Sequence, residues 1–279
     1  MTKKQRYFSK HFIIHTLAVL ATIPIFFPVY WLTVSALQSP DNIIAIPPRL
    51  FPTEFTLHYL QLVFTEFNVG RHLFNSIWIS IISVFCILAV SCLAAFSYIA
   101  YRYKLRETFS KMVLFVYMFP QILIIVPLYI LMSRVGLINT YFGLILALMA
   151  FEIPICIWIM QSYFETIPRD LINAAEVDGL PKIKTLWYVF LPVALPGLSA
   201  AGIMTFIGVW NNFLLANLLL VSLESKTMPV IIADFAARDT AHQGVIMASS
   251  LIVSIPSFLF AIFAQKYLVG GLTSGAVKS

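Results

Sequence analysis

Charged residues are scarce in this sequence. Asp, Glu, Lys and Arg make up 11% of the 279 residues, and 60% of the residues are hydrophobic. Soluble globular domains carry about 25% charged residues, and a water-soluble fold cannot cover its surface with fewer than half of that share. The composition therefore excludes an ordinary soluble protein and predicts a chain whose solvent is lipid.

Motifs for metal binding and nucleotide hydrolysis are lacking as well. The three cysteines, Cys86, Cys92 and Cys156, lie inside apolar runs and fit neither a metal-ligand spacing nor a disulfide framework. We interpret them and the five histidines as packing or surface residues, and expect no metal site. The chain carries no G-x-x-x-x-G-K-[ST] loop of the kind that cradles phosphates. It is therefore not expected to hydrolyse nucleotide or to hold a cofactor itself.

Long uncharged runs are what the sequence has instead. A helix needs about 20 apolar residues to cross the hydrocarbon core of a bilayer, whereas the strands of a membrane barrel show alternating segments of about ten residues. The runs are too long for strands, so they predict an all-α membrane protein with a bundle of six transmembrane helices. The predicted spans lie near residues 12–37, 74–100, 112–133, 141–162, 196–221 and 245–268.

The basic residues are placed asymmetrically between these spans. With six spans, one side of the membrane holds the N-terminal leader, the 101–111 loop, the 163–195 loop and the tail, which carry 13 of the 18 Lys and Arg residues. The positive-inside rule therefore predicts that both termini lie in the cytoplasm. The apolar run behind the basic leader is longer than the about 7–15 residues of a signal peptide, so a retained first helix is expected.

Two segments on the opposite side are long enough to have structure of their own. Residues 38–72 contain four prolines and an amphipathic stretch at 57–67, and residues 222–244 join the last two spans. Both are predicted to face the outside. There, each either contacts a partner or is a solvated connector.

The 163–195 loop predicts a helix–turn–helix elbow. Pro168 suits the first turn of a helix, where its missing N–H costs nothing, and Gly179 supplies a left-handed stop. Pro181 then opens a second helix that runs until Leu191-Pro192. Four residues of the first helix fall on one face at helical spacing: Leu171, Ala174, Ala175 and Asp178. This face either docks another protein or rests on lipid headgroups.

The same loop carries a motif with fixed spacing. Residues 173–175 read Asn-Ala-Ala, and Gly179, Val189 and Leu191-Pro192 follow in the register of the pattern E-A-A-x3-G-x9-I-x-L-P. This motif resembles the EAA loop of bacterial ABC importer permeases. Other stretches resemble the second permease subunit of maltose-type carbohydrate importers: 120–129, 136–140, 174–179, 210–213 and 265–279. The resemblance covers most of residues 70–279 and implies a type I permease bundle.

The resemblance implies a domain organisation, a function and a set of partners. A permease domain would cover residues 12–269, between a cytoplasmic leader (1–11) and a cytoplasmic tail (270–279). In the bacterial cytoplasmic (inner) membrane, a second, similar permease would complete the pathway for a di- or oligosaccharide. An extracytoplasmic binding protein would deliver the sugar and contribute much of the choice of sugar. Two ATP-binding subunits would bind ATP and Mg and hydrolyse the ATP.

The resemblance also implies that the elbow docks into a cleft of an ATP-binding subunit. The residues carried over to this role are Asn173, Ala174, Ala175, Glu176, Asp178, Gly179, Leu191 and Pro192. The family has Glu at the first position of the motif, where this chain has Asn173, so a charge-assisted contact with the ATPase is absent. Glu176, three residues on, is a candidate replacement.

Polar residues inside the spans are candidates for the substrate pathway. Glu152 is the only charged residue deep in a span, where a carboxylate is costly and usually faces a cavity or a partner. It contacts sugar hydroxyls or the partner subunit, or else it is a structural carboxyl bonded to a neighbouring helix. The amides are equally ambiguous, since amides join transmembrane helices at least as often as they bind ligands. They are Asn75, Gln121, Asn211 and Asn212.

Two other functions are weighed against the importer. A self-contained secondary transporter tends to have more spans or an inverted repeat, and more buried ionisable residues, which argues against it here. A membrane scaffold or insertase would use the elbow to recruit a soluble partner. A neighbouring gene for a P-loop ATPase would favour the importer over both.

Overall fold

The computed structural model describes residues 3–276 except 44, 53, 102 and 239–242, and the regular secondary structure of these residues is entirely helical. The α-helices are α1 (Lys3–Ala36), α2 (Pro40–Ile43), α3 (His58–Thr65), α4 (Val69–Ala100), α5 (Arg106–Tyr117), α6 (Gln121–Arg134), α7 (Tyr141–Phe164), α8 (Asp170–Val177), α9 (Lys182–Thr185), α10 (Leu191–Trp210), α11 (Leu214–Leu219), α12 (Met228–Arg238) and α13 (Gln243–Ala276). A π-helical turn, η1 (Leu186–Phe190), precedes α10, and a 3₁₀ turn, η2 (Leu223–Ser225), precedes α12.

Five of the described helical segments are long and apolar enough to cross a membrane. They are His11–Ala36, Val69–Ala100, Tyr141–Phe164, Lys182–Trp210 and Gln243–Phe263. The number becomes six if α5 and α6 are counted as one broken span. The predicted all-α membrane fold is therefore confirmed, with five or six candidate spans.

The chain divides into two compact units. The first comprises residues 1–69 and 232–254, and the second comprises residues 70–231 and 255–279. In the first unit, the segment between α1 and α3 folds back on itself, and Gln38 Nε2 donates to the carbonyl of Arg49 at 3.0 Å. The predicted amphipathic stretch at 57–67 is confirmed as α3, which buries Tyr59 and Val63.

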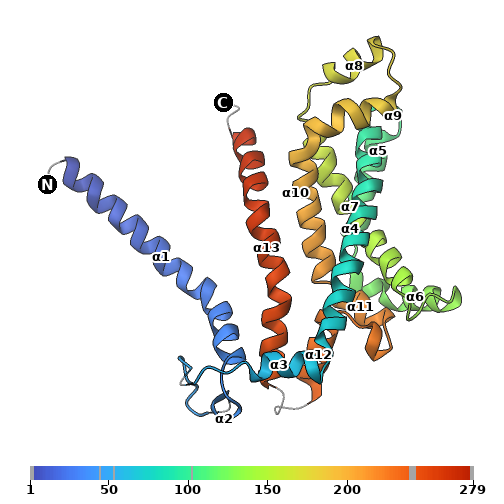
Figure 1. Cartoon of the computed structure of the whole chain (residues 1–279). Coiled ribbons are helices and arrows are strands. Elements are labelled where there is room, and N and C mark those ends of the chain that lie inside the picture. Colours follow the sequence, from blue (N-terminus) through green and yellow to red (C-terminus); the bar gives the residue numbers. More distant parts are fainter. Residues whose placement is uncertain (1–2, 44, 53, 102, 239–242, 277–279) are drawn as a thin grey trace. The chain divides into compact units, whose positions relative to one another are not determined.

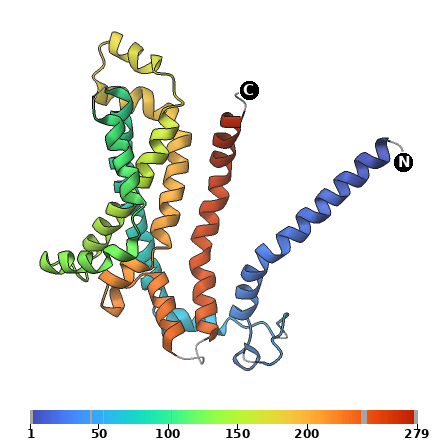
Figure 2. The same cartoon turned by 180° about the vertical axis from the view of Figure 1, so that it is seen from behind.

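The core of the second unit lies between α4, α7 and α10, which run side by side (Figures 1 and 2). The serines of α4 let the helices approach closely, as small residues do in membranes; Ser76, Ser80, Ser83 and Ser91 are all buried. Three aromatic rings join the helices near one end. The ring centroid of Phe190 lies 5.3 Å from that of Phe96 on α4 and 5.0 Å from that of Phe164 on α7.

The predicted span near 112–133 corresponds to two helices, which count as one broken span. The structure has α5 and α6, bent by 91° at a short break. Pro120 lies in this break with an extended backbone (φ −60°, ψ 120°). A proline cannot donate to the preceding turn, and it disfavours helical backbone at the residue before it. The chain therefore leaves the line of α5 at this point.

The predicted span at 196–221 also has different ends. Its helix begins earlier, because α9, η1 and α10 form one continuous segment from Lys182 to Trp210. It also ends earlier, at Trp210, and Asn212 starts a new helix by accepting a 3.0 Å hydrogen bond from the amide of Leu215 in the first turn of α11. The uncharged run at 185–223 thus contains a break between two helices, and the Asn212 side chain accepts a hydrogen bond at the start of the second.

Asn139 holds two turns of the second unit together. It adopts a left-handed backbone conformation (φ 59°), and its backbone N–H donates to the Leu219 carbonyl at 2.7 Å. Its side-chain oxygen accepts from the amides of Val221 and Ser222 at 3.1 and 3.0 Å. The same oxygen lies within 3.0 Å of the Ser222 hydroxyl and 2.9 Å of the Ser225 hydroxyl. One side chain therefore fixes the connection between α6 and α7 to the segment that follows α11.

We expect Asn139→Ala to lower the stability of the protein by about 2–3 kcal/mol, because the two amides lose their acceptor and the left-handed backbone no longer has a residue that favours it. Asn139→Gly should lose less, since glycine tolerates that backbone. The measurement is thermal unfolding in detergent, followed by intrinsic fluorescence, with the exposed Asn217→Ala as control. An unchanged midpoint for Asn139→Ala would contradict the role assigned to this side chain.

Candidate functional site

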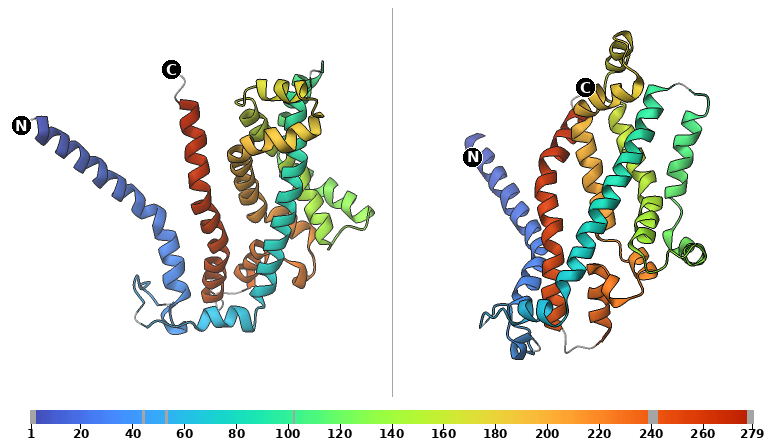
Figure 3. Two further views of the ribbon diagram at one scale, coloured as in Figure 1. Left: turned by 45° about the horizontal axis from the view of Figure 1, so that its top comes forward. Right: turned by 45° about the vertical axis from the view of Figure 1, so that its right-hand side comes forward.

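The first helix of the elbow, α8, projects beyond α9 at one end of the second unit (Figures 1 and 3). It ends in a Schellman motif, in which the amide of Gly179 donates to the Glu176 carbonyl at 3.0 Å and the amide of Leu180 donates to the Ala175 carbonyl at 2.9 Å. Gly179 has a φ of 76°. The predicted left-handed stop is therefore confirmed.

The prediction that the second helix of the elbow ends at Leu191-Pro192 is wrong. Leu191 and Pro192 lie in the first turn of α10, directly after the π-helical turn η1. A proline inside a helix lacks one hydrogen bond and clashes with the preceding turn. A π-turn is wider than an α-turn, so it makes room for the ring without breaking the helix. The elbow consequently continues into α10 with no loop between them.

The residues predicted to share one face of α8 differ in burial. Ala175 is buried together with Ile172, and Leu171 is partly buried, so this side of α8 packs against the elbow itself. The other side is exposed. It presents Asn173, Ala174, Glu176, Val177, Asp178 and Gly179, and Val177 is 88% exposed. Only one of the two alanines therefore remains accessible to a partner.

Lys182 connects the elbow to the end of α4. Its Nζ lies 3.0 Å from a carboxylate oxygen of Glu176 and donates to the carbonyl of Ala100 at 2.5 Å. It also lies 4.5 Å from the ring centroid of Tyr101. One ammonium group thus holds α8, α9 and the last turn of α4 together. The sequence reasoning missed Lys182, since neither its spacing from Glu176 nor a motif marks it.

The cavity at the break between α5 and α6 has a volume of about 580 Å³. It is lined from α5 to α6 by residues 116–121 with Ile124 and Leu128, and on α7 by residues 150–152 and Pro154. Two of the predicted pathway residues, Gln121 and Glu152, therefore line one cavity. The other lining side chains are mainly aromatic and aliphatic, so these two supply polar groups to an otherwise apolar surface.

Gly208 on α10 makes room for the carboxylate of Glu152. A Cβ atom at position 208 would lie 2.7 and 2.9 Å from the two carboxylate oxygens. No ion pair or side-chain hydrogen bond of Glu152 occurs within the described part of the chain. The carboxylate therefore lies against the backbone of α10, next to the cavity. No sequence pattern marks Gly208, because its role arises only from the contact between two helices.

The remaining predicted pathway amides lie elsewhere. Asn75 is buried, donates to the carbonyls of Glu224 and Lys226 at 3.0 and 3.1 Å, and accepts from the Tyr141 hydroxyl at 3.1 Å. Asn211 donates to the Ile207 carbonyl in its own helix at 3.0 Å. These two amides serve helix packing and a helix end.

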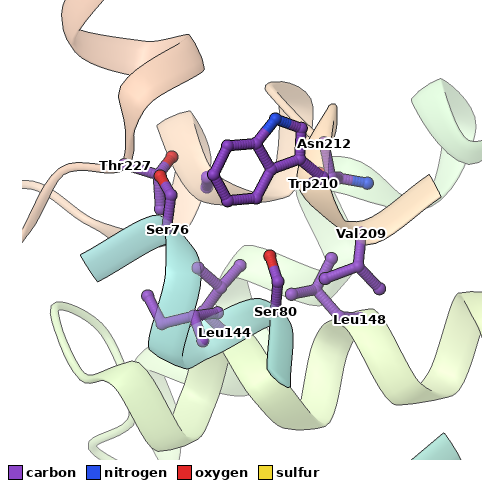
Figure 4. A pocket seen from close by; sticks show the side chains of 10 residues that line it. Ser76, Ser80, Leu144, Leu148, Val209, Trp210, Asn212 and Thr227 are labelled. Carbon is purple, nitrogen blue, oxygen red and sulfur yellow. The ribbon is translucent and has the colours of Figure 1, made fainter. Parts of the chain in front are cut away.

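Asn212 borders a small internal cavity of about 10 Å³, close to what one water molecule needs. Ser76, Ser80, Trp210 and Thr227 line it as well (Figure 4). The hydroxyl of Thr227 is buried without a protein partner. The size and lining suit a single bound water rather than a sugar.

A possible metal-ligand pair was overlooked in the sequence reasoning. His11 and His15 stand four residues apart on α1, and a ring nitrogen of His15 lies 2.7 Å from the His11 carbonyl. Among the described residues, however, no group of three or more His, Cys, Asp or Glu side chains is placed to hold a metal ion. The pair therefore offers too few ligands for a site.

The sequence is similar to those of known membrane transport proteins. Residues 87–273 match the family described as "Binding-protein-dependent transport system inner membrane component". The trehalose/maltose transport system permease protein MalG of Thermococcus litoralis is 32% identical over 262 residues, which are 94% of each chain. The trehalose transport system permease protein SugB of Mycobacterium tuberculosis is 32% identical over 266 residues, which are 94% of this chain and 96% of that protein.

A solved structure has the same fold. It is a crystal structure of a bacterial ABC transporter involved in the import of the acidic polysaccharide alginate. One of its chains superposes with a TM-score of 0.82 at 20% identity, over 96% of this chain and 98% of that chain. A second structure, of the bacterial alginate ABC transporter in complex with an alginate pentasaccharide-bound periplasmic protein, matches with a TM-score of 0.65 at 16% identity, over 94% and 95% of the two chains.

Gly197 and Gly208 give a matched pair of predictions for α10. We expect Gly197→Ala to destabilise the protein by about 1–3 kcal/mol, because its Cβ would lie 2.1 Å from the ring of Tyr163 and overpack the helix contact. Gly208→Ala should cost much less, because the group that must move is the free end of the Glu152 side chain. Thermal unfolding in detergent compares the two variants. Equal losses at both positions would contradict the placement of Glu152.

Proposed function

Because this chain belongs to the family of binding-protein-dependent transport system inner membrane components, we propose that it forms a sugar translocation pathway together with a second, similar permease. The chain is a multi-pass inner-membrane protein, the permease subunit of an ATP-binding-cassette sugar importer and not its ATPase subunit. Subunits of this family carry no cofactor. Two ATP-binding subunits would supply the energy, and a sugar-loaded binding protein would deliver the substrate from outside.

The cavity at the α5–α6 break supports a di- or oligosaccharide as the substrate. Its volume of about 580 Å³ lies within the range of about 300–1,000 Å³ that is usual for small-molecule sites. The rings of Tyr117, Phe119 and Phe151 line it and offer apolar faces to the C–H face of a sugar ring. Glu152 and Gln121 would bind hydroxyl groups, the first as acceptor and the second as acceptor and donor. Relatives of this chain are named for trehalose/maltose and arabinooligosaccharides.

The anchoring of the elbow by Lys182 is the observation that carries the coupling mechanism. The exposed side of α8 would enter a cleft of one ATP-binding subunit, while its buried side stays attached to α9. When the ATPase dimer closes on ATP, a push on α8 would pass through Lys182 to the end of α4 and through Phe190 to α7. The helices of the bundle would then switch between inward-facing and outward-facing arrangements.

Asn173 changes how this docking works. It occupies the position of the family's Glu, and it is exposed on α8. One oxygen of Glu176, the candidate replacement, is already held by Lys182 at 3.0 Å. The Glu176 carboxylate therefore stabilises the elbow internally. Docking of α8 would rest on uncharged hydrogen bonds from Asn173 and on close packing at Ala174.

The distribution of basic residues supports an orientation with both termini in the cytoplasm. In that orientation the elbow and the Lys- and Arg-rich ends of the helices lie on the side where ATP is available. The turns that Asn139 joins, and the segment after α11, lie on the side that would meet the binding protein. The two functional contacts are therefore placed at opposite ends of the second unit.

We expect Gly179→Asp to abolish the increase in ATPase activity that a sugar-loaded binding protein produces in the co-expressed complex. A carboxylate on the docking side and a disfavoured left-handed backbone would both disturb the end of α8. Gly136→Asp, at a similar φ of 70° with free space around it, is the matched control for folding and for ATPase activity without binding protein, because it lies outside the elbow, after α6. The measurement is ATP hydrolysis by purified complexes in lipid nanodiscs. Wild-type protein that purifies without any ATPase would refute the importer function.

Glu152→Ala should reduce sugar uptake by roughly tenfold, since a hydrogen bond to a charged group contributes about 1.5–3 kcal/mol. Glu152→Gln should retain most of the uptake, because an amide still bonds hydroxyl groups. The measurement is uptake of labelled sugar by proteoliposomes with a fixed amount of loaded binding protein. Asn217→Ala, an exposed amide outside the cavity, is the control. Unchanged uptake by Glu152→Ala would remove the carboxylate from the pathway.

A further inference from the structure

A second open pocket, of about 450 Å³, lies between the α4–α5 turn and the start of α8. It is lined by Tyr103, Lys104, Arg106 and Arg169. Three of these four side chains are cationic, and no acidic side chain contributes to the lining. The coupling mechanism does not use this pocket.

The positive charges of the pocket are not neutralised by the described residues. Lys104, Arg106 and Arg169 form no ion pair there. Arg106 stacks over the ring of Tyr98, with 5.3 Å between its Cζ atom and the ring centroid, and its Nη1 atom is buried without a hydrogen-bond partner. Buried guanidinium donors are almost always paired. The cationic lining and the unpaired guanidinium donor therefore suit an anion with several acceptor oxygens.

The surroundings of the pocket indicate an amphiphilic ligand. Arg106 is the first residue of α5, so the unpaired N–H groups of that helix end add to the positive field. Large apolar side chains are exposed at the start of this helix: Leu105, directly before it, and Phe109 and Met112 on it are 68%, 55% and 64% exposed. The exposed Tyr101 and Tyr103 are typical of a membrane–water interface. A phosphate in the pocket would thus have an apolar stripe beside it for acyl chains.

We propose that this pocket binds the phosphate headgroup of an anionic phospholipid of the cytoplasmic leaflet. Basic pockets between helices on the cytoplasmic side commonly bind such lipids. Since Arg169 precedes α8 while Lys104 and Arg106 belong to the α4–α5 turn, a bound phosphate ties the elbow to the bundle. The lipid thereby supports transmission from the ATPase beside the Lys182 contact. The proposal rests on the cytoplasmic orientation proposed above.

The test uses the whole transporter complex in nanodiscs of phosphatidylcholine, with or without phosphatidylglycerol. The pocket variant combines Arg106→Gln with Arg169→Gln, and its control combines Lys111→Gln with Lys184→Gln, which removes the same charge from the same side of the membrane. Both control lysines are exposed and outside the pocket. Two quantities are measured: phosphatidylglycerol retained after transfer to detergent, by mass spectrometry, and ATPase activity stimulated by loaded binding protein.

We expect the wild type and the control to retain phosphatidylglycerol, and the pocket variant to bind it roughly tenfold more weakly. Phosphatidylglycerol should raise the stimulated ATPase activity of the wild type and the control but not of the pocket variant. Equal retention by all three proteins would overturn the proposal. A pocket variant that loses its ATP-binding subunits with lipid retention unchanged would also overturn it, and would assign the pocket to an acidic surface of the ATPase.

Inorganic phosphate added to phosphatidylcholine nanodiscs distinguishes a lipid from a soluble anion. It should not restore stimulation, and restoration would overturn the proposal. A wild-type complex without stimulated ATPase activity in any lipid would count against the proposed function instead. Lipid retention by the same samples would still show whether the pocket binds phosphatidylglycerol, so the two failures are distinguishable.

Discussion

In a bilayer core, each backbone N–H and C=O group must find its partner inside the protein, since no water is present to bond it. Long helices satisfy this requirement for most of the chain, and the informative places are those where a helix stops. There, other groups take over the free amides and carbonyls: Asn212 at the start of α11, Asn139 beside the segment after α11, and the Schellman turn at Gly179. The architecture therefore depends on how each helix end is satisfied.

The functional surfaces of the second unit coincide with such interruptions. The 91° break at Pro120 separates α5 from α6 and leaves the cavity that Gln121 and Glu152 line. The Gly179 stop creates the elbow, and Lys182 anchors it to the end of α4. An unbroken bundle of straight helices would offer neither the cavity proposed to hold sugar nor the helix proposed to dock.

Much of the fold was predictable from the sequence, because a chain that lies in lipid has few charged residues and long uncharged runs. The fold class and the stop at Gly179 were predicted correctly, each from a local rule. The 91° angle of the break and the continuity of α9 with α10 were not, because the two prolines have opposite effects: Pro120 lies in a break, whereas a π-turn before Pro192 keeps the helix continuous. Lys182 and Gly208 were missed because their contacts with Ala100 and Glu152 join segments distant in sequence. Asn75 was left open between the pathway and helix packing, and its hydrogen bonds join α4 to α7 and to the segment before α12.

The continuity of the elbow with α10 has a mechanical consequence. From Lys182 to Trp210 the chain is one 29-residue helix, roughly 43 Å long at the usual rise per residue. A rod of this length turns a tilt of about 5° at one end into a shift of about 4 Å at the other. In the proposed orientation, a small angular displacement at the nucleotide side would thus be amplified at Trp210, next to the segment that would meet the binding protein. The same helix would also transmit motion in the other direction. A displacement caused by a loaded binding protein outside would reach the ATPase side without passing through a flexible loop.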